Sequence, residues 1–367
     1  MRTSDLDYFL PKEQISQQPM SPREAAKLFV VNRQTGKREH KHVADLEHLI
    51  GENDCLVLNV TSVLRARLFG TATTGSKREV FLIKKILGEN TGKKEAVFAS
   101  HRPFFRMGEA KQSPHNIWEA LIKGSAKQGD EIFLDGDLSL NVEKNNDDGT
   151  FLISFKISDE ELQKFISLQG HVPVPPYIHR EPGLSEYETV YADPSQRRSV
   201  AAPTAGFHLT EELLFSLREK GVQIEKVVLD VGLGTFQPVR TENLEEHKIH
   251  AENIYVSEES AQRINEAKKN GKRIVAVGTT TLRVLESVAS EDGIIKSFSG
   301  ETRLFITPSY KFKVVDVLLT NFHLPKSSLL ALVAAFIGSV EKTLKIYNEA
   351  VGERYRFFSF GDAMWIE

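Results

Sequence analysis

Features that define several classes of protein are absent from this sequence of 367 residues. A single cysteine, Cys55, excludes an intramolecular disulfide framework. No apolar window approaches about 18 residues, and the opening residues MRTSDLDYFLPKEQ contain no basic region followed by an apolar run. Neither a membrane span nor a secretory leader is expected, so we predict a soluble cytoplasmic protein.

A strong charge of either sign is also absent. The formal net charge is −3 and the isoelectric point is near 6.4, so an RNA partner would need a local basic surface. Residues 65–157 carry 15 Lys or Arg and 12 Asp or Glu, a net charge of +3. This contrast fits either a segment that helps to hold RNA or an ordinary solvated face. The composition leaves a tRNA partner open.

Motifs for bound nucleotides and metals are incomplete. The run Gly232-Leu233-Gly234 lacks the third glycine of a dinucleotide fingerprint, and nothing matches a P-loop. His247, His250 and Glu252 do not share one face of a helix or a strand, so polar lining of a ligand pocket is the better interpretation for them. We expect no metal and no dinucleotide cofactor.

The first and last parts of the chain alternate between strand and helix patterns. Short apolar runs predict buried strands at residues 27–31, 55–59, 224–231, 273–277 and 314–322. Helices are predicted at residues 211–220 and 257–270, from Thr281 onward, and at 327–337. The last helix is apolar nearly all round but too short to cross a membrane. This alternation predicts an α/β fold.

Residues 64–157 have a different character. Helical periodicity is largely confined to residues 116–123, and hairpin signals such as Asp135-Gly136-Asp137 join alternating segments. Strands are predicted at residues 79–86, 95–100, 138–142 and 151–157. We predict a small all-β barrel insert, which interrupts a barrel-like α/β catalytic domain formed by residues 1–63 and 158–367.

Residues 199–210 predict a strand, a tight turn of small residues and a helix start. Thr210 suits the N-cap position, and two glutamates follow it at the positive end of the helix. Small residues let the backbone approach a ligand, so His208 is expected at the mouth of a pocket. From these residues alone, a packing turn with a satisfied histidine is the more frequent explanation.

Four predicted strands end in Gly, Thr, Asn or His before a helix or bend. Because ligands bind outside the carboxyl ends of strands in α/β sheets, these turns are expected to converge on one pocket. Asn321, His323 and Lys326 suit a carboxylate or a hydroxyl-rich ligand, or alternatively a capped helix with a surface lysine. The aromatic residues within 355–364 either stack on a base or belong to the core.

Taken together, several long motifs resemble the S-adenosylmethionine:tRNA ribosyltransferase-isomerase family. They cover nearly the whole chain, in order: LNVTSVLRARLFG (58–70), VPVPPYIHR (172–180), SVAAPTAGFHLTEELL (199–214), VGLGTFQPV (231–239), VGTTTLRVLES (277–287), TNFHLPKSSLLALVAAF (320–336) and YRFFSFGDAMWI (355–366).

The resemblance implies an enzyme of queuosine biosynthesis. Such an enzyme transfers the ribosyl moiety of S-adenosylmethionine to 7-aminomethyl-7-deazaguanine at the wobble position of tRNA and isomerises it. The products are epoxyqueuosine, adenine and methionine. S-adenosylmethionine is then a substrate, no further cofactor is needed, and tRNA is the partner. Whether the protein is a monomer or a homodimer is left open.

This chemistry needs a base beside the sulfonium and an acid for the departing adenine. His208, His323 and Asp362 are the candidates, with His208 ranked first. Contacts to sugar hydroxyls, carboxylate or phosphate are expected from Asn59, Thr204, Ala205, Gly206, Gly232, Gly234, Thr235, Phe236, His250, Gly278, Thr279, Thr280, Arg283, Asn321, Lys326, Arg356 and Ser359.

The sequence departs from the family pattern at several positions. The family usually has Asn-Asp-Thr-Arg-Val where this chain has Asn59-Val60-Thr61-Ser62-Val63, so one carboxylate and one guanidinium are missing. Either a former ion pair was lost or a substrate contact changed. Glu188 replaces an expected Gln, Arg303 an acidic or polar residue, and Ser309 a Gly, while residues 100–116 look like an addition to the insert. A diverged paralogue that binds tRNA or a nucleoside with altered or no turnover is therefore the alternative function.

Overall fold

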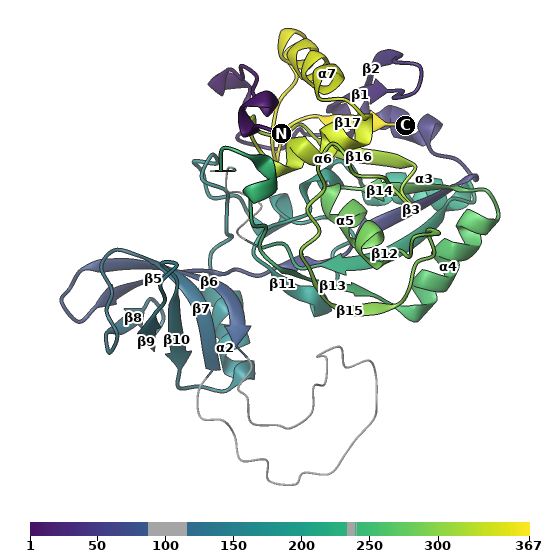
Figure 1. Ribbon diagram of the computed structural model, residues 1–367. Helices are drawn as coiled ribbons and strands as arrows, with labels where there is room; N and C mark the ends of the chain where they lie inside the picture. Colours follow the sequence, from purple (N-terminus) through teal and green to yellow (C-terminus); the bar gives the residue numbers. More distant parts are fainter. Residues whose placement is uncertain (87–115, 233–238, 240) are drawn as a thin grey trace, which may run out of the picture. The chain divides into compact units, whose positions relative to one another are not determined.

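The computed structural model describes residues 1–86, 116–232, 239 and 241–367 (Figure 1). They form two compact units, one of residues 1–63 and 175–367 and the other of residues 64–174. The α/β class and the β-barrel insert that the sequence predicts are confirmed. The predicted strand at 95–100 and the addition at 100–116 lie outside the described residues, apart from Asn116.

One sheet of nine strands forms the centre of the first unit. In spatial order the strands are β15 (Phe298–Thr302), β13 (Glu252–Val256), β12 (Gln223–Leu229), β3 (Asp54–Asn59), β14 (Arg273–Val277), β16 (Val317–Asn321), β17 (Ala363–Ile366), β1 (Lys27–Val31) and β2 (Arg38–His42). Among the described residues β15 and β2 each pair with one strand, so this sheet is a row with two ends rather than a closed barrel.

Four neighbouring strands of this sheet run parallel. β12, β3, β14 and β16 pair in parallel register, for example Val275 with Leu56 and with Val317. Their carboxyl ends therefore lie at the same edge of the sheet. This edge is where a ligand site is expected in an α/β fold.

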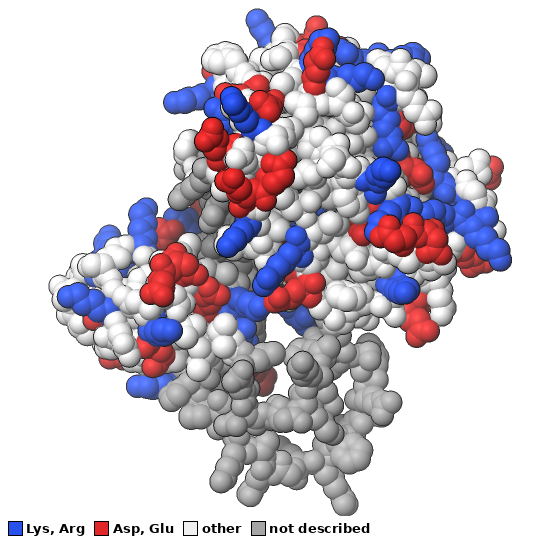
Figure 2. Space-filling view, in the orientation of Figure 1, with Lys and Arg blue, Asp and Glu red and all other residues white. Residues whose placement is uncertain are grey.

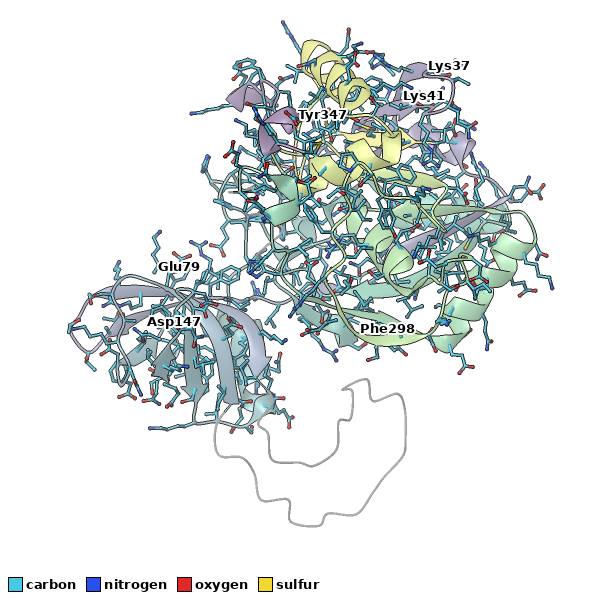
Figure 3. All side chains as sticks on the ribbon, viewed as in Figure 1. Lys37, Lys41, Glu79, Asp147, Phe298 and Tyr347 are labelled. Carbon is cyan, nitrogen blue, oxygen red and sulfur yellow. The ribbon has the colours of Figure 1, made fainter. Side chains whose placement is uncertain are left out.

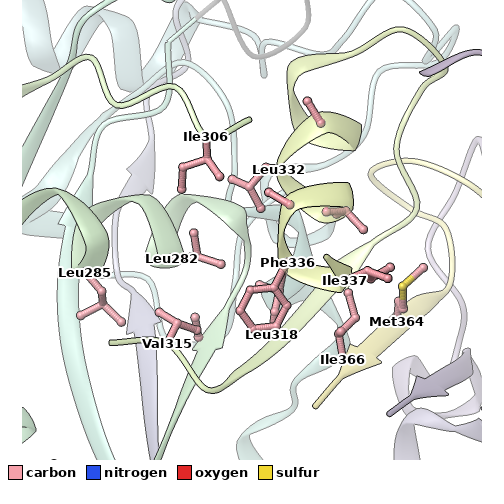
Figure 4. Close-up of a cluster of buried hydrophobic side chains, with 14 of the residues drawn as sticks. Leu282, Leu285, Ile306, Val315, Leu318, Leu332, Phe336, Ile337, Met364 and Ile366 are labelled. Carbon is pink, nitrogen blue, oxygen red and sulfur yellow. The ribbon is translucent and has the colours of Figure 1, made fainter. Parts of the chain in front are cut away.

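Helices cover both faces of the sheet. They are α1 (Leu46–Leu49), α3 (Glu211–Glu219), α4 (Glu258–Lys269), α5 (Thr279–Val288), α6 (Ser328–Ile337) and α7 (Val340–Gly352). Side chains that alternate along each strand divide between two cores: Cys55 and Val57 pack with α4 to α7, whereas Leu56 and Leu58 pack with α1 and α3. Figure 4 shows the first of these cores between α5 and α6.

The helix ends follow the sequence closely. Thr210 is the N-cap of α3 and accepts a hydrogen bond from the Leu213 N–H, as predicted. Helix α6 has Ser327 as N-cap, and every residue from Leu330 to Ile337 is buried, which confirms the short core helix. Helix α5 starts at Thr279, two residues before the predicted start.

Charged side chains mark the end strand β2. Its exposed residues alternate with half-buried ones, and Lys37, just before the strand, and Lys41 both pair with Glu39, at 2.5 and 3.0 Å. Figure 3 labels both lysines at this end of the sheet. Charges on an unpaired edge oppose pairing with another chain.

The second unit is a closed antiparallel barrel. Its strands follow the spatial order β10 (Phe151–Phe155), β7 (Asn116–Lys123), β6 (Lys77–Ile86), β5 (Arg67–Ala72), β8 (Glu131–Leu134) and β9 (Leu138–Asn145). The predicted helical character of residues 116–123 is wrong. Trp118, Ala120 and Ile122 are buried while the residues between them are not, a period of two that fits a strand in a barrel wall.

The second unit also contains residues 158–174, which the sequence assigns to the α/β domain. They include α2 (Asp159–Gln169), which begins with a capping box between Ser158 and Glu161. Lys85 pairs with Asp159 at 2.6 Å, and His171 pairs with Arg67 as an antiparallel bridge. These contacts place the boundary at 174/175 instead of 157/158.

Candidate active site

A pocket with about 690 Å³ of empty space lies at the carboxyl edge of the parallel strands. Its walls come from six segments of the sequence. The lining residues are Tyr177, Ala202, Pro203, Thr204, Ala205, Val231, Gly278, Thr279, Thr280, Thr320, Asn321, His323, Leu324, Ser327, Leu329, Phe358 and Ser359.

The predicted strand ends do meet at this pocket. Val231 follows β12, Gly278 to Thr280 follow β14, and Asn321 ends β16. The fourth strand end belongs to β11 (Arg197–Ser199), which pairs with β4 (Ser62–Val63) in a separate two-stranded sheet. Its following turn contains the 3-10 helix η7 (Thr204–His208) and still contributes to the wall.

Helix α5 starts at the pocket. Gly278 has φ of 90°, a conformation that favours glycine, and this residue turns the chain from β14 into the helix. Thr279 and Thr280 in the first turn then face the pocket near the positive end of the helix dipole. Asn59, fully buried, donates to the Thr280 hydroxyl at 3.3 Å and to the Leu229 carbonyl at 3.1 Å. Asn59 therefore holds the wall without lining it.

The amide of Asn321 joins three of the walls. Its Oδ1 accepts from the Thr204 hydroxyl at 3.2 Å, and its Nδ2 lies 3.1 Å from both the Phe358 carbonyl oxygen and His208 Nε2. A carbonyl can only accept, so the Asn321 amide nitrogen donates to both partners. His208 Nε2 is then an acceptor, which requires a neutral ring.

The two predicted catalytic histidines have different surroundings. Burial lowers the pKa of His208 to about 4; the Asp362 carboxylate opposes this shift, whereas the positive charges of Arg356 and Arg23 act in the same direction as burial. Burial also lowers the pKa of His323 to about 3. His323 lines the pocket, whereas His208 lies behind Asn321 and does not line it. Ranking His208 first is not supported by these positions.

The backbone of His323 is fixed by two tyrosines. The Tyr8 hydroxyl donates to its carbonyl oxygen, and its N–H donates to the Tyr347 hydroxyl at 3.3 Å. Tyr347 is labelled on α7 in Figure 3. The ring Nε2 lies 3.0 Å from the Thr320 hydroxyl, so both ends of this residue are held in place.

Asp362 is not at the pocket. Its carboxylate accepts from the Arg356 side chain at 2.8 and 3.2 Å, from the Arg356 N–H at 2.8 Å and from the Lys27 N–H at 3.1 Å. These bonds close the turn that presents Phe358 and Ser359 to the pocket. Asp362 and Arg356 thus have structural partners, and the predicted contact of either with a ligand finds no support in the geometry.

Two further predicted residues line a second cavity. It has about 430 Å³ of empty space, part of it open to solvent, and is lined by Ile249, His250, Glu252, Arg283, Leu304, Phe305, Ile306, Ser328, Leu329 and Leu332. Leu329 lines both cavities, so they adjoin at the start of α6. His250 and Arg283 are therefore next to the main pocket and not in it.

The other predicted contacts are scattered. Gly206 is buried against the Tyr191 side chain, and Gly232 donates to Glu252 at 3.1 Å. Lys326 pairs with Asp7 at 2.7 Å, which fits the surface-lysine alternative. Gly234, Thr235 and Phe236 lie outside the described residues.

The sequence named the aromatic residues within 355–364, which include Phe358, but missed Tyr177 in the pocket wall. Tyr177 and Phe358 pack at 4.4 Å between ring centroids, and the Tyr177 hydroxyl lies 2.8 Å from Ser359 Oγ. Phe358 has φ of 72°, which is unusual for a bulky residue and is found mostly at functional sites. The motif VPVPPYIHR contains Tyr177, but no local pattern distinguishes it from a core aromatic.

The departures from the family pattern at residues 60, 62, 188, 303 and 309 are not among the residues that line the pocket. Ser62, fully buried, donates to the Glu188 carboxylate, and the Val63 N–H donates to the same oxygen at 3.2 Å. Two of the departures, at 62 and 188, thus contact each other. Residues 60–63 are not among the pocket residues, and Arg303 and Ser309 are exposed.

Neither a metal-binding cluster nor a membrane-spanning helix is found in the described part of the chain. No group of three or more His, Cys, Asp or Glu side chains there could hold a metal ion. No helix there is long and apolar enough to cross a membrane.

The comparisons with known proteins agree along the whole chain. A family model described as a queuosine biosynthesis protein matches residues 3–366. The S-adenosylmethionine:tRNA ribosyltransferase-isomerase of Thermosipho melanesiensis is 44% identical over 368 residues, and that of Acetivibrio thermocellus is 45% identical over 372 residues. Each alignment covers 100% of both chains.

A solved structure is similar as well. The crystal structure of an S-adenosylmethionine tRNA ribosyltransferase from Thermotoga maritima matches with a TM-score of 0.53 and 34% sequence identity. The match covers 99% of this chain and 100% of that one.

The low pKa of His208 predicts a pH-dependent stability. An unfolded histidine binds a proton near pH 6.5, whereas the buried ring does so only near pH 4. Between these values the unfolded state holds more protons, so stability falls as the pH falls. His208→Gln keeps an acceptor for Asn321 but cannot titrate. From pH 7.5 to pH 5 we expect the wild type to lose about 1 to 2 kcal/mol more than this variant.

The measurement is urea denaturation followed by Trp365 fluorescence in a Trp118→Phe background, since Trp118 belongs to the barrel. His48→Gln, at an exposed site on α1, is the matched control and leaves the pH dependence unchanged. An equal pH dependence in wild type and His208→Gln would contradict the neutral buried ring.

Proposed function

We infer that this chain, which belongs to the queuosine biosynthesis protein family, is an S-adenosylmethionine:tRNA ribosyltransferase-isomerase. The inference rests on identities of 44 and 45% over the full length of enzymes with that name. We propose that it transfers and isomerises the ribosyl moiety of S-adenosylmethionine on 7-aminomethyl-7-deazaguanine in tRNA. The products are epoxyqueuosine, adenine and methionine. The comparisons give no support to a binder without turnover.

The main pocket suits the sulfonium substrate. Among the described residues, no Lys, Arg, Asp or Glu lines it. Burial keeps both nearby histidines neutral at pH 7, so neither adds a positive charge that would repel a sulfonium. Aromatic faces attract cations, and Tyr177 and Phe358 supply two such faces. The same pair offers a stacking surface for adenine.

The hydroxyl groups of the pocket suit the ribose. Thr204, Thr279 and Thr280 face the space between the aromatic pair and the start of α5. Threonine hydroxyls both donate and accept, so they can match either end of a sugar hydroxyl. We propose that these residues orient the ribosyl group whose bonds change in the reaction.

We propose His323 as the residue that moves a proton. It lines the pocket and is neutral, so it presents a lone pair to a proton beside the sulfonium. His208 is proposed as a positioning residue, because it contacts Asn321 and not the pocket.

RNA binding and location follow from the proposed substrate. Figure 2 shows Lys and Arg interspersed with Asp and Glu on the visible face, which agrees with the small net charge. Local groups of basic residues would therefore hold the phosphates. We propose a cytoplasmic enzyme, because its tRNA substrate is found there.

The direct test is adenine release. The protein is incubated with S-adenosylmethionine and tRNA that carries the deazaguanine precursor, and adenine and epoxyqueuosine are measured. We expect both products with this tRNA, neither without it, and lower affinity for tRNA as salt rises. Bound tRNA without adenine release would instead support the diverged binder.

Substitution distinguishes the proposed roles of His323 and His208. His323→Ala is expected to lower adenine release at least about 100-fold, the usual effect of removing a general acid or base. His208→Gln is expected to lower it by less than about 10-fold, because the Asn321 amide keeps an acceptor. His48→Ala is the control. A larger loss in His208→Gln than in His323→Ala would reverse the assignment.

A further inference from the structure

The second cavity contains a buried arginine whose hydrogen bonds are incomplete. Arg283 on α5 is 6% exposed; its Nε donates to the Leu304 carbonyl at 3.1 Å, and its Nη1 pairs with the Glu252 carboxylate. Its Nη2 is buried and has no partner among the described residues. An unpaired buried donor on a charged group is costly, so it calls for an explanation.

The surroundings of Arg283 define what could supply the missing partner. Leu304, Ile306 and Leu332 form an apolar wall, which suits a short aliphatic chain. The start of α6 forms another wall. Its N-cap Ser327 accepts a hydrogen bond from the Leu330 N–H, and the Ser328 and Leu329 N–H groups come before it in the first turn. An acceptor in this cavity would therefore meet both a guanidinium and the positive end of a helix.

The charge balance of the cavity narrows the ligand class. Arg283 and Glu252 already neutralise each other at the wall. A phosphate would place an uncompensated negative charge beside the Glu252 carboxylate. A zwitterion carries one carboxylate for Arg283 and one ammonium group for the Glu252 side, so the cavity stays neutral. An α-amino acid group on an aliphatic chain fits this description.

We propose that this second cavity holds the methionyl end of S-adenosylmethionine, with its carboxylate on Arg283 Nη2. The inference rests on the proposed function, which places the adenosyl part in the adjoining pocket. Leu329 lines both cavities, so one ligand can extend from one into the other past the start of α6. Arg283 then selects a carboxylated sulfonium, and the same subsite holds methionine until it leaves.

The test compares S-adenosylmethionine with its decarboxylated form, which keeps the sulfonium and the adenosyl group. KM for adenine release is measured with precursor tRNA at saturation, and equilibrium dialysis of both ligands is run in parallel. In the wild type we expect the decarboxylated form to bind about 10- to 100-fold more weakly, the loss of one charge-assisted contact. In Arg283→Gln we expect this ratio to fall towards one.

The ratio separates recognition from structural damage. A variant that only disturbs the fold weakens both ligands equally and leaves the ratio unchanged. Arg33→Gln is the control, because Arg33 is half-buried and, like Arg283, donates to backbone carbonyls, but it follows β1 and does not line the second cavity. Arg33→Gln should keep the wild-type ratio.

Several results would overturn the proposal. One is a ratio near one between the affinities of the wild type for the two ligands. This measurement needs no variant, so it decides the question even if Arg283→Gln fails to fold. Another is an unchanged ratio in Arg283→Gln with a raised KM for tRNA, which would assign Arg283 to RNA phosphate. Absence of adenine release with either ligand would instead refute the proposed function, while the dialysis ratio would still report on the subsite.

Discussion

The Asn321 amide is the contact on which the pocket depends most. Two of its partners, Thr204 and His208, precede β16 by more than 100 residues in the sequence, and the third, Phe358, follows Asn321 by 37. The pocket can therefore form only after the parallel sheet, the 3-10 turn and the C-terminal turn have assembled. The contact also uses the Nε2 lone pair of His208, which agrees with the proposal that this histidine is a positioning residue.

Two kinds of surface meet at the start of α6. On one side the walls are uncharged, with hydroxyls and an aromatic pair. On the other side Arg283 and Glu252 place two opposite charges in an apolar cavity. S-adenosylmethionine has an uncharged adenosyl end, a central sulfonium and a zwitterionic amino acid end, so the proposed ligand suits such a division. Under this proposal the site residues that the sequence grouped together divide into two subsites.

Local signals in the sequence were sufficient for much of the fold. The strand at 273–277, the N-cap Thr210 and the buried helix α6 depend on short-range patterns and are found as predicted. The helical character of 116–123 is wrong because a barrel wall imposes a period of two on a segment whose composition also suits a helix.

The site was less predictable than the fold. Strand ends indicate the edge of the sheet at which the pocket lies, and Thr204, Gly278 and Asn321 line it, while their contacts with a ligand stay a prediction. Which histidine faces the pocket depends on the contact of His208 with Asn321, 113 residues away, and no local pattern encodes it. The same holds for Tyr177 and for the clamp between Asp362 and Arg356, whose partners are set by tertiary packing.

A crystal structure with S-adenosylmethionine bound tests the central claim most directly. The account predicts the adenosyl group between the Tyr177 and Phe358 rings and the start of α5, with the methionyl carboxylate on Arg283. Ligand density away from the carboxyl edge of β12, β14 and β16 would contradict it.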